Sequence, residues 1–284
     1  MKFMDLPNEY CTDNSFFCIL PIEYEKDLTY GEGASKGSSS IIEASKHLEY
    51  YDEQYDNEPF IKGVFTLESL KLNEVNANES IEKIASVVSG VDCGFLISLG
   101  GDHAVTIGTV KGFEKKNDNF SVIILDAHSD MFHSWNNSQL NHRCVSQRVS
   151  EKHKTLLVGI RSMDKDEKEI IEGNENVDLL KMHEFSIEKF KEKLSKLDSK
   201  VYLSIDVDVF DPSFIRNTGT PEPGGFFWKE IISILEEIFK SKKVIGADIV
   251  EFAPNVNFSS ESFSLAKLSY KLMSLREKFN NSEC

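Results

Sequence analysis

Residues 122–130 read VIILDAHSD, an apolar run that changes abruptly into a group of acidic and imidazole side chains. A short apolar run without polar alternation is typical of a strand that is covered on both faces, as the strands of a parallel sheet are. Ligands of such sheets bind beyond the carboxyl ends of the strands. This stretch therefore predicts both a fold class and a site, with Asp126, His128 and Asp130 as its first candidate residues.

Seven further apolar runs have the same character, and they lie at residues 16–20, 60–66, 95–99, 156–160, 177–181, 201–205 and 244–250. Segments with helical spacing separate them, and five are expected to form helices: residues 39–51, 79–89, 187–197, 229–240 and 259–278. Alternation of strand and helix predicts a three-layer α/β domain with eight strands.

A single domain, residues 1–284, is expected from the length of the chain and from the absence of internal repeats. Residues 30–40 (YGEGASKGSSS) are rich in Gly and Ser and predict a surface loop. About 30 residues precede this loop, which is too few for a separate domain.

The composition excludes several classes of function. Lys and Arg number 32 and Asp and Glu number 47, so the net charge of −15 argues against nucleic acid or an anionic membrane as a partner. A small cationic substrate would be attracted, although the acidity could also serve solubility alone. Cysteines without a C-x-x-C pair make a disulfide framework or zinc knuckle unexpected, and they are Cys11, Cys18, Cys93, Cys144 and Cys284. With no apolar leader and no run long enough to span a membrane, we expect a reduced, cytoplasmic protein.

Two further polar clusters follow predicted strands. GGDH (residues 100–103) comes after the run at 95–99, and SIDVDVFDP (residues 204–212) continues the run at 201–205. Alternate residues of extended backbone share a face, so Asp126, His128 and Asp130 should point the same way, and so should Asp206 and Asp208. Six candidate metal ligands result, two imidazoles and four carboxylates: His103, Asp126, His128, Asp130, Asp206 and Asp208.

Each cluster alone also has a purely structural interpretation, as a helix cap, a tight glycine turn or an Asx turn before Pro212. Together, at three strand ends, they favour a metal site, because burying four carboxylates without cations would cost too much free energy. The oxygen-rich, thiolate-free set predicts Mn²⁺ first, then Co²⁺, Ni²⁺, Zn²⁺ or Fe²⁺. Two such ions could activate a water molecule at neutral pH, which is hydrolase chemistry without a Ser or Cys nucleophile.

Five motifs resemble the successive signature blocks of the ureohydrolases, the arginase and agmatinase superfamily: GGDHAVTIG, DAHSD, SIDVDVFDPSF, GTPEPGG and DIVEFAP. The resemblance extends over essentially the whole chain. It implies a three-layer α/β/α sandwich around an eight-stranded parallel sheet, two manganese ions, and a homotrimer or hexamer. It assigns one ion to His103, Asp126, Asp130 and Asp206, and the other to Asp126, His128, Asp206 and Asp208. Asp126 and Asp206 would bridge the ions.

The resemblance also implies roles in catalysis. Asp130 would accept the proton of the nucleophile, His142 in NHRCVSQRV would shuttle protons, and Glu251 in DIVEFAP would pair with the substrate guanidinium. Thr220 would lie beside the metal pocket, or serve only as a turn residue before Pro221. We expect Asp102 and Asp211 to fix backbone turns and Asp248 to be structural. The remaining histidines are expected to be surface or packing residues: His47, His133, His153 and His183.

The identity of the guanidino substrate depends on two positions. Phe132 stands where arginases carry a polar residue that recognises the amino-acid head group, which favours agmatine, cleaved to putrescine and urea. Arg143, beside the expected shuttle histidine, could instead accept a carboxylate, which leaves arginine, guanidinobutyrate, guanidinopropionate and formiminoglutamate as alternatives. Two other classes stay open: a non-catalytic, metal-binding regulatory paralogue, and an amide hydrolase on the related deacetylase fold.

Overall fold

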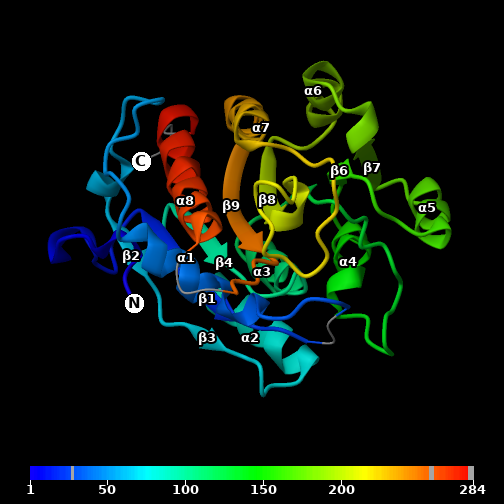
Figure 1. Cartoon of the computed structure of the whole chain (residues 1–284), viewed down its shortest axis with the longest axis horizontal. Helices are drawn as coiled ribbons and strands as arrows, with labels where there is room; N and C mark the ends of the chain where they lie inside the picture. The colour runs from blue at the N-terminus through cyan, green and yellow to red at the C-terminus, as the bar shows by residue number, and fades with distance from the viewer. Residues whose placement is uncertain (27–28, 256–258, 281–284) are drawn as a thin grey trace.

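Strands and helices alternate along the chain in the computed structural model, which describes residues 1–26, 29–255 and 259–280 (Figure 1). The strands are β1 (Phe17–Glu23), β2 (Val64–Thr66), β3 (Leu70–Lys71), β4 (Phe95–Leu99), β5 (Ser121–Leu125), β6 (Thr155–Ile160), β7 (Val177–Lys181), β8 (Lys200–Asp206) and β9 (Lys243–Val250). The α-helices are α1 (Gly37–Ser45), α2 (Ala77–Gly90), α3 (Val105–Glu114), α4 (Val145–Ser150), α5 (Lys165–Glu172), α6 (Ile187–Ser195), α7 (Trp228–Ser241) and α8 (Ser260–Phe279).

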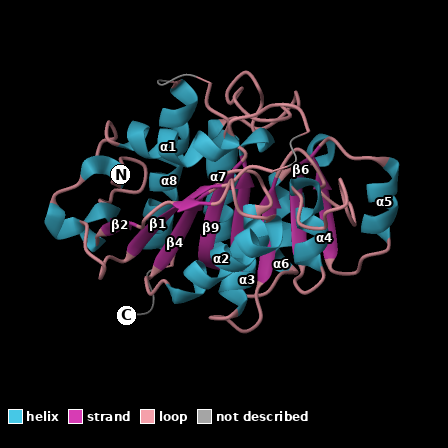
Figure 2. Ribbon diagram, turned by 90° about the horizontal axis from the view of Figure 1, so that it is seen from below, coloured by secondary structure: helices cyan, strands magenta, loops and turns pink. Residues whose placement is uncertain are grey.

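The strands form one sheet in the order β2-β1-β4-β9-β8-β5-β6-β7, and every neighbouring pair is parallel. Helices cover both faces, with α1 and α8 on one side and α2 and α3 on the other (Figure 2). The predicted three-layer α/β/α fold is thereby confirmed. The sheet has one strand more than the eight expected, because the two-residue β3 also pairs with β1.

Two hydrophobic cores explain why the predicted strands lack polar alternation. On β5, Ile123 and Leu125 pack into the core beneath α7 and α8, whereas Val122 and Ile124 pack into the core beneath α2 and α3. All four side chains are fully buried. Since burying one such side chain contributes roughly 1.5–3 kcal/mol, both faces of the strand stabilise the fold.

The strand predicted for residues 60–66 is wrong in its first half. Pro59–Lys62 forms a 3-10 helix, and only Val64–Thr66 is extended. Pro59 has the fixed φ and missing N–H that suit the first turn of a helix, and Gly63 leaves that helix with a φ of +81°. Apolar content alone did not distinguish the helical turn from the strand.

The surface loop predicted for residues 30–40 is also wrong in its second half. Helix α1 begins at Gly37 and ends at Ser45, six residues before the predicted end. Gly37 and Ser38 are buried, and a Cβ atom at Gly37 would lie 2.4 Å from the carbonyl oxygen of Phe252. The glycine therefore permits close approach of two backbones rather than a flexible loop.

The described cysteines are free thiols, which agrees with the expectation of no disulfide framework. They are Cys11, Cys18, Cys93 and Cys144, and Cys284 lies outside the described residues. Among the helices of the described segments, none has the length and apolar character that crossing a membrane requires.

Candidate metal centre

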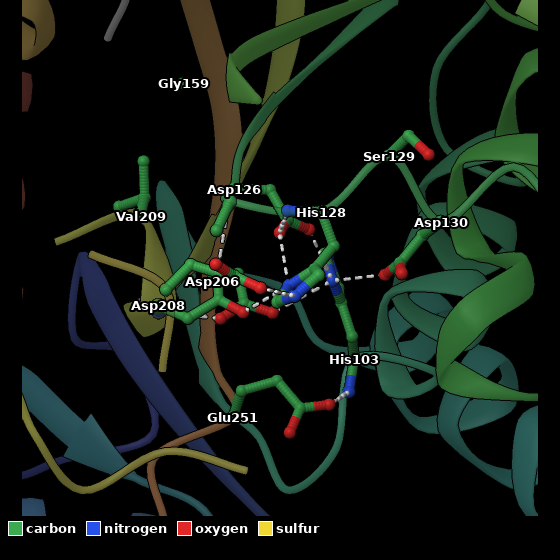
Figure 3. Close-up of polar contacts among 12 residues, drawn as sticks. His103, Asp126, His128, Ser129, Asp130, Gly159, Asp206, Asp208, Val209 and Glu251 are labelled. Carbon is green, nitrogen blue, oxygen red and sulfur yellow. Dashed lines mark hydrogen bonds and ion pairs between the residues drawn. The ribbon is translucent and has the colours of Figure 1, made fainter. Parts of the chain in front are cut away.

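The predicted ligands and the predicted substrate-binding residue Glu251 meet at the carboxyl ends of four strands that are neighbours in the middle of the sheet, β4, β9, β8 and β5. His103 follows β4, Asp126 follows β5, Asp206 is the last residue of β8, and Glu251 follows β9. Figure 3 shows the side chains of His103, Asp126 and Asp206 pointing toward one another, with Glu251 hydrogen-bonded to the backbone of His103. Parallel strands bring all these ends to one edge, as the sequence analysis predicted.

At Asp130 and Asp208 the backbone reaches this arrangement by turns, so the expected alternation along extended backbone is wrong for these two residues. Asp208 lies in a 3-10 turn, Val207–Val209, whose start is capped by the Asp206 carboxylate accepting a hydrogen bond from Asp208 N at 2.8 Å. Asp130 has a left-handed φ of +49°. Asn, Asp and Gly tolerate this region best, which explains how an aspartate can turn back toward the site here.

His103 is the centre of the first group of donor atoms. Its Nδ1 lies 3.1 Å from Asp126 Oδ2 and 3.2 Å from Oδ2 of both Asp130 and Asp206. His103 Nδ1 and Asp126 Oδ2 are buried and have no hydrogen-bond partner. Ligand atoms at about 2.1 Å from an octahedral ion are separated by about 3.0 Å. The spacing therefore fits donors that surround one cation.

The ring of His103 is fixed from behind. Its Nε2 lies 3.1 Å from Ser204 Oγ, which lies 3.2 Å from Thr106 Oγ1, and Thr106 donates to Asp248 at 3.0 Å. Tyr202 donates to the same Asp248 carboxylate at 2.6 Å. This chain leaves Nδ1 of His103 as the nitrogen directed at the donor cluster, an arrangement typical of metal-binding histidines.

A second group overlaps the first and consists of Asp126, His128 and Asp208. His128 Nδ1 lies 2.7 Å from Asp208 Oδ2 and 3.8 Å from Asp126 Oδ1. Asp126 belongs to both groups, which agrees with its expected role as a bridge. Asp206 belongs to the first group, and Asp130 Oδ2 adds a fourth donor atom there.

Burial opposes ionisation of these carboxyl groups. Burial, with the negative charges of Asp208 and Asp130, raises the pKa of Asp126 to about 7. Burial also raises the pKa of Asp206 well above its usual range. Although burial disfavours the charged form of His128, the Asp208 carboxylate raises the His128 pKa to about 11. Divalent cations would stabilise the ionised carboxylates, so the residues present fit a metal-binding function.

A cavity of about 280 Å³ opens onto the donor cluster. Predicted site residues that line it are His128, Asp130, His142, Arg143, Asp206, Asp208, Thr220 and Glu251. Residues that were not predicted line it as well, among them Thr29, Tyr30, Asp164 and Glu222. The cavity therefore joins the strand ends to the loop near residue 30, which the sequence analysis treated only as a surface feature.

Glu251 and His142 occupy different parts of this cavity. Glu251 is in a left-handed conformation, with φ +65°, and its Oε1 accepts a hydrogen bond from His103 N at 2.6 Å. Burial and the charge of Asp102 raise the Glu251 pKa well above its usual range. His142 Nε2 lies 2.8 Å from Thr29 Oγ1, and burial lowers the His142 pKa.

Arg143 lines the cavity, whereas Phe132 supports it from behind. The Arg143 guanidinium carbon lies 4.4 Å from the centre of the Phe132 ring and 4.0 Å from that of Trp135. Arg143 Nη2 also donates to Asp164 Oδ2 at 3.4 Å. Cation–π stacking on two rings fixes the position of the guanidinium. Phe132 is not among the residues that form the cavity wall.

Sequence reasoning missed Glu167, which holds the segment that carries Asp130. Its Oε1 accepts hydrogen bonds from Ser129 Oγ at 2.7 Å and Met131 N at 2.9 Å. The available signal was the Asp164-x-x-Glu167 spacing at the start of α5, which is that of a capping box. Ser204 had no comparable signal, because a serine within a strand carries no motif.

The two aspartates that were expected to fix backbone turns accept hydrogen bonds from nearby backbone N–H groups. Asp102 accepts hydrogen bonds from Lys26 N and Ala104 N, and Asp211 accepts from Ser213 and Gly224 N. His153 is buried against Phe120, with Nδ1 2.9 Å from the Phe120 carbonyl oxygen, whereas the other three are exposed: His47, His133 and His183.

Fold and site together define a three-layer α/β/α protein with two overlapping groups of metal-ligand type at the ends of its central strands. A sequence model described as the arginase family matches residues 16–274, and the chain belongs to that family. The predicted relationship to ureohydrolases is confirmed, and with it the prediction that the chain is an enzyme.

Named relatives extend over most of this chain. An N(1)-aminopropylagmatine ureohydrolase of Synechocystis is 35% identical over 267 residues, covering 90% of this chain and 87% of the relative. An agmatinase of Pyrococcus horikoshii is 32% identical over 276 residues, covering 96% and 95%. The crystal structure of an agmatine ureohydrolase of Thermoplasma volcanium superposes with a TM-score of 0.89 at 28% identity, covering 100% of this chain and 96% of the other.

Proposed function

We propose that this protein hydrolyses a guanidino compound with a carboxylate-free tail, agmatine first, to urea and putrescine. One observation carries the proposal: two donor groups that share Asp126 open into a cavity whose wall includes the buried carboxyl group of Glu251. The relatives named agmatinase and aminopropylagmatine ureohydrolase support the same class of substrate.

The proposed cofactors are two divalent metal ions, Mn²⁺ first, with Co²⁺, Ni²⁺, Zn²⁺ and Fe²⁺ as alternatives. His103, Asp126, Asp130 and Asp206 would hold one ion, and Asp126, His128, Asp206 and Asp208 the other. When bound, two such ions lower the pKa of water and supply a hydrolytic nucleophile near neutral pH.

Glu251 is the proposed acceptor for the substrate guanidinium. Because its carboxyl group is buried and its pKa is raised, it needs a cationic partner to ionise. A guanidinium is planar and presents paired N–H donors, which match the two oxygens of a carboxylate. Pairing with Glu251 would therefore bind the substrate and orient its central carbon toward the donor groups.

His142 and Asp130 are the proposed proton carriers. Both line the cavity, and the lowered pKa of His142 keeps the imidazole neutral and able to accept a proton at pH 7. The contact of His142 Nε2 with Thr29 Oγ1 gives the ring a polar partner on the loop near residue 30. Asp130 would receive the proton of the nucleophile and pass it to the departing amine.

The tail of the substrate would lie toward Arg143, Asp164 and Glu222 at the cavity wall. Two carboxylates face one arginine there, so the balance of charge favours a cationic tail. A longer polyamine, N(1)-aminopropylagmatine, is the second candidate, supported by the 35% identical relative of that name. Guanidino acids remain a third candidate because Arg143 could bind their carboxylate.

A urea assay tests the proposal. The Mn²⁺-loaded protein is incubated separately with agmatine, N(1)-aminopropylagmatine, arginine, 4-guanidinobutyrate and guanidine. We expect urea from agmatine or its aminopropyl derivative and much less from the others. Absence of urea from every compound, with metal bound, would instead support the regulatory paralogue. The cytoplasmic location and the homotrimer or hexamer stay predictions from the sequence.

A further inference from the structure

We propose that Arg161 is the positioning residue for the second metal group, Asp126, His128 and Asp208, and that it joins this group to the wall of the substrate cavity. The inference rests on the two-metal site proposed above. Arg161 follows β6 and has no place in the catalytic scheme described so far.

The guanidinium of Arg161 is surrounded by backbone carbonyl oxygens rather than by acids. Its Nη2 donates to Asp208 O at 2.7 Å, to Glu222 O at 2.8 Å and to Phe210 O at 3.2 Å. Nε donates to Pro223 O at 3.1 Å, and Nη1 donates to Gly159 O at 3.2 Å. Within residues 1–26, 29–255 and 259–280, no carboxylate oxygen lies within ion-pair distance of this arginine.

The main chain at Arg161 contacts the other half of the same metal group. Arg161 N donates to Ala127 O at 2.8 Å, and Ser162 N donates to the same oxygen at 3.0 Å. Ala127 stands between the two candidate ligands Asp126 and His128, and its own N–H donates to Asp208 Oδ1 at 2.9 Å. One residue therefore fixes both segments that carry the second group.

The surrounding backbone is shaped to admit this side chain. A Cβ atom at Gly225 would lie 2.6 Å from Arg161 Nη2, so the glycine leaves room for the guanidinium. At Gly159, which has a φ of +96°, a Cβ atom would lie 3.0 Å from Asp126 O and 2.9 Å from a Val209 methyl carbon. Figure 3 shows Gly159 and Val209 beside Asp126 and Asp208.

Only arginine can make this set of contacts. Its planar guanidinium carries five N–H donors in a fixed fork, whereas lysine offers three donors on one nitrogen at the end of a flexible stem. Within the described residues, the hydrogen bonds of Arg161 go to the segments of Ala127 and Asp208 and not to His103 or Asp206 of the first group, so its loss should act on one metal ion more than on the other.

Titration of the metal-free protein with Mn²⁺, followed by calorimetry and by paramagnetic resonance, tests this selectivity. We expect wild type to bind two ions with a spin-coupled signal. Arg161→Lys should retain one ion at nearly wild-type affinity and bind the other roughly 10–100-fold more weakly, the range typical of residues that orient metal ligands. Arg161→Met should weaken the binding of the same ion. If Arg161→Met does not fold, the metal titration of Arg161→Lys is the test.

Arg216→Met is the matched control, because Arg216 is an exposed arginine beyond the same ligand loop. It should bind both ions as wild type does. In the double variant Arg161→Lys with Asp208→Asn, the losses should not add, since both changes act on one site. Equal weakening of both ions, additive losses, or unchanged binding of both in Arg161→Lys would overturn the inference.

The two proposals fail in different ways. If wild type forms urea and Arg161→Lys keeps both ions, the positioning role is wrong and the proposed function stands. If wild type forms no urea from any guanidine but Arg161→Lys loses one of two ions, the positioning role stands and the proposed function is wrong.

Discussion

Ser204 Oγ lies 3.1 Å from His103 Nε2, and both side chains are fully buried. The contact fixes the imidazole so that Nδ1 faces the first donor group. We predict that Ser204→Ala weakens Mn²⁺ binding by roughly 10–100-fold, the usual effect of losing a group that orients a metal-binding histidine. Titration with Mn²⁺ measures this, with Ser195→Ala on the exposed face of α6 as the control. Unchanged affinity in Ser204→Ala would show that the ring needs no such support.

Asp126 is the residue shared by the two donor groups. Asp126→Asn keeps the shape of the side chain but removes the charge and one oxygen donor. We predict that it lowers the affinity for both ions and reduces urea formation by more than about 100-fold, beyond the effect of an orienting residue. Metal content per chain and the rate of urea release measure the two effects. Retention of two tightly bound ions would contradict the bridging role.

The stability gained from metal should depend on pH. Asp126 has a folded-state pKa raised to about 7, so without cations the fold loses stability as pH rises from the usual aspartate range through that value. His128 has a folded-state pKa raised to about 11, and its contribution is present below pH 6.5 and declines as pH rises toward 11. Both groups therefore make the metal-free fold less stable at pH 8 than at pH 5. We predict that Mn²⁺, which would stabilise the ionised site, raises the melting temperature more at pH 8 than at pH 5.

Scanning calorimetry with and without Mn²⁺ at the two pH values checks this expectation. Asp126→Asn serves as the control, because it removes one titrating group and should reduce the difference between pH 5 and pH 8. An equal gain in melting temperature at both pH values would mean that the buried acids do not control metal binding.

A buried ion pair far from the metal centre should contribute to stability alone. Lys271 Nζ lies 2.6 Å from Asp52 Oδ1, with side chains that are 2% and 0% exposed. Lys271→Met leaves the Asp52 charge buried without its cation, which should cost about 3–5 kcal/mol of unfolding free energy. Lys267→Met removes the partly exposed pair with Glu53 and should change stability by less than about 1 kcal/mol. Urea denaturation measures both.

Arg143 should influence which tail is preferred. Its guanidinium is held against Phe132 and Trp135 and lines the cavity, so its charge acts at a fixed position. Replacing it with alanine should raise kcat/KM for agmatine relative to 4-guanidinobutyrate by roughly tenfold, corresponding to about 1.4 kcal/mol of charge interaction. Steady-state kinetics with both compounds tests this. A ratio that does not change would remove Arg143 from substrate recognition.

The sequence predicted those parts of the molecule that depend on strong local patterns. The strand at 95–99 has the predicted bounds because it is a short apolar run that ends at a glycine, and the strand at 177–181 also has the predicted bounds although it contains Asp178 and Lys181. The six candidate ligands were found from their place after apolar runs. Their convergence follows from parallel strands, which present all carboxyl ends at one edge.

Other parts depend on contacts that no local pattern contains. The hold of Glu167 on the segment that carries the left-handed Asp130 arises only when α5 meets the loop that follows β5. Gly37 begins α1 at a point where the Phe252 backbone leaves no room for a side chain, a contact that the local sequence does not reveal. The stacking of Arg143 on Trp135 joins residues whose intervening loop is irregular, and its geometry cannot be deduced from spacing.

The four strands that supply His103, Asp126, Asp206 and Glu251 are adjacent in space but widely separated along the chain. β9, which lies between β4 and β8, is the last strand to leave the ribosome. A chain interrupted before β9 therefore lacks the strand that joins β4, which His103 follows, to β8, which ends at Asp206. Metal uptake should thus report that synthesis and folding of the central sheet are complete, and a truncated chain should remain metal-free.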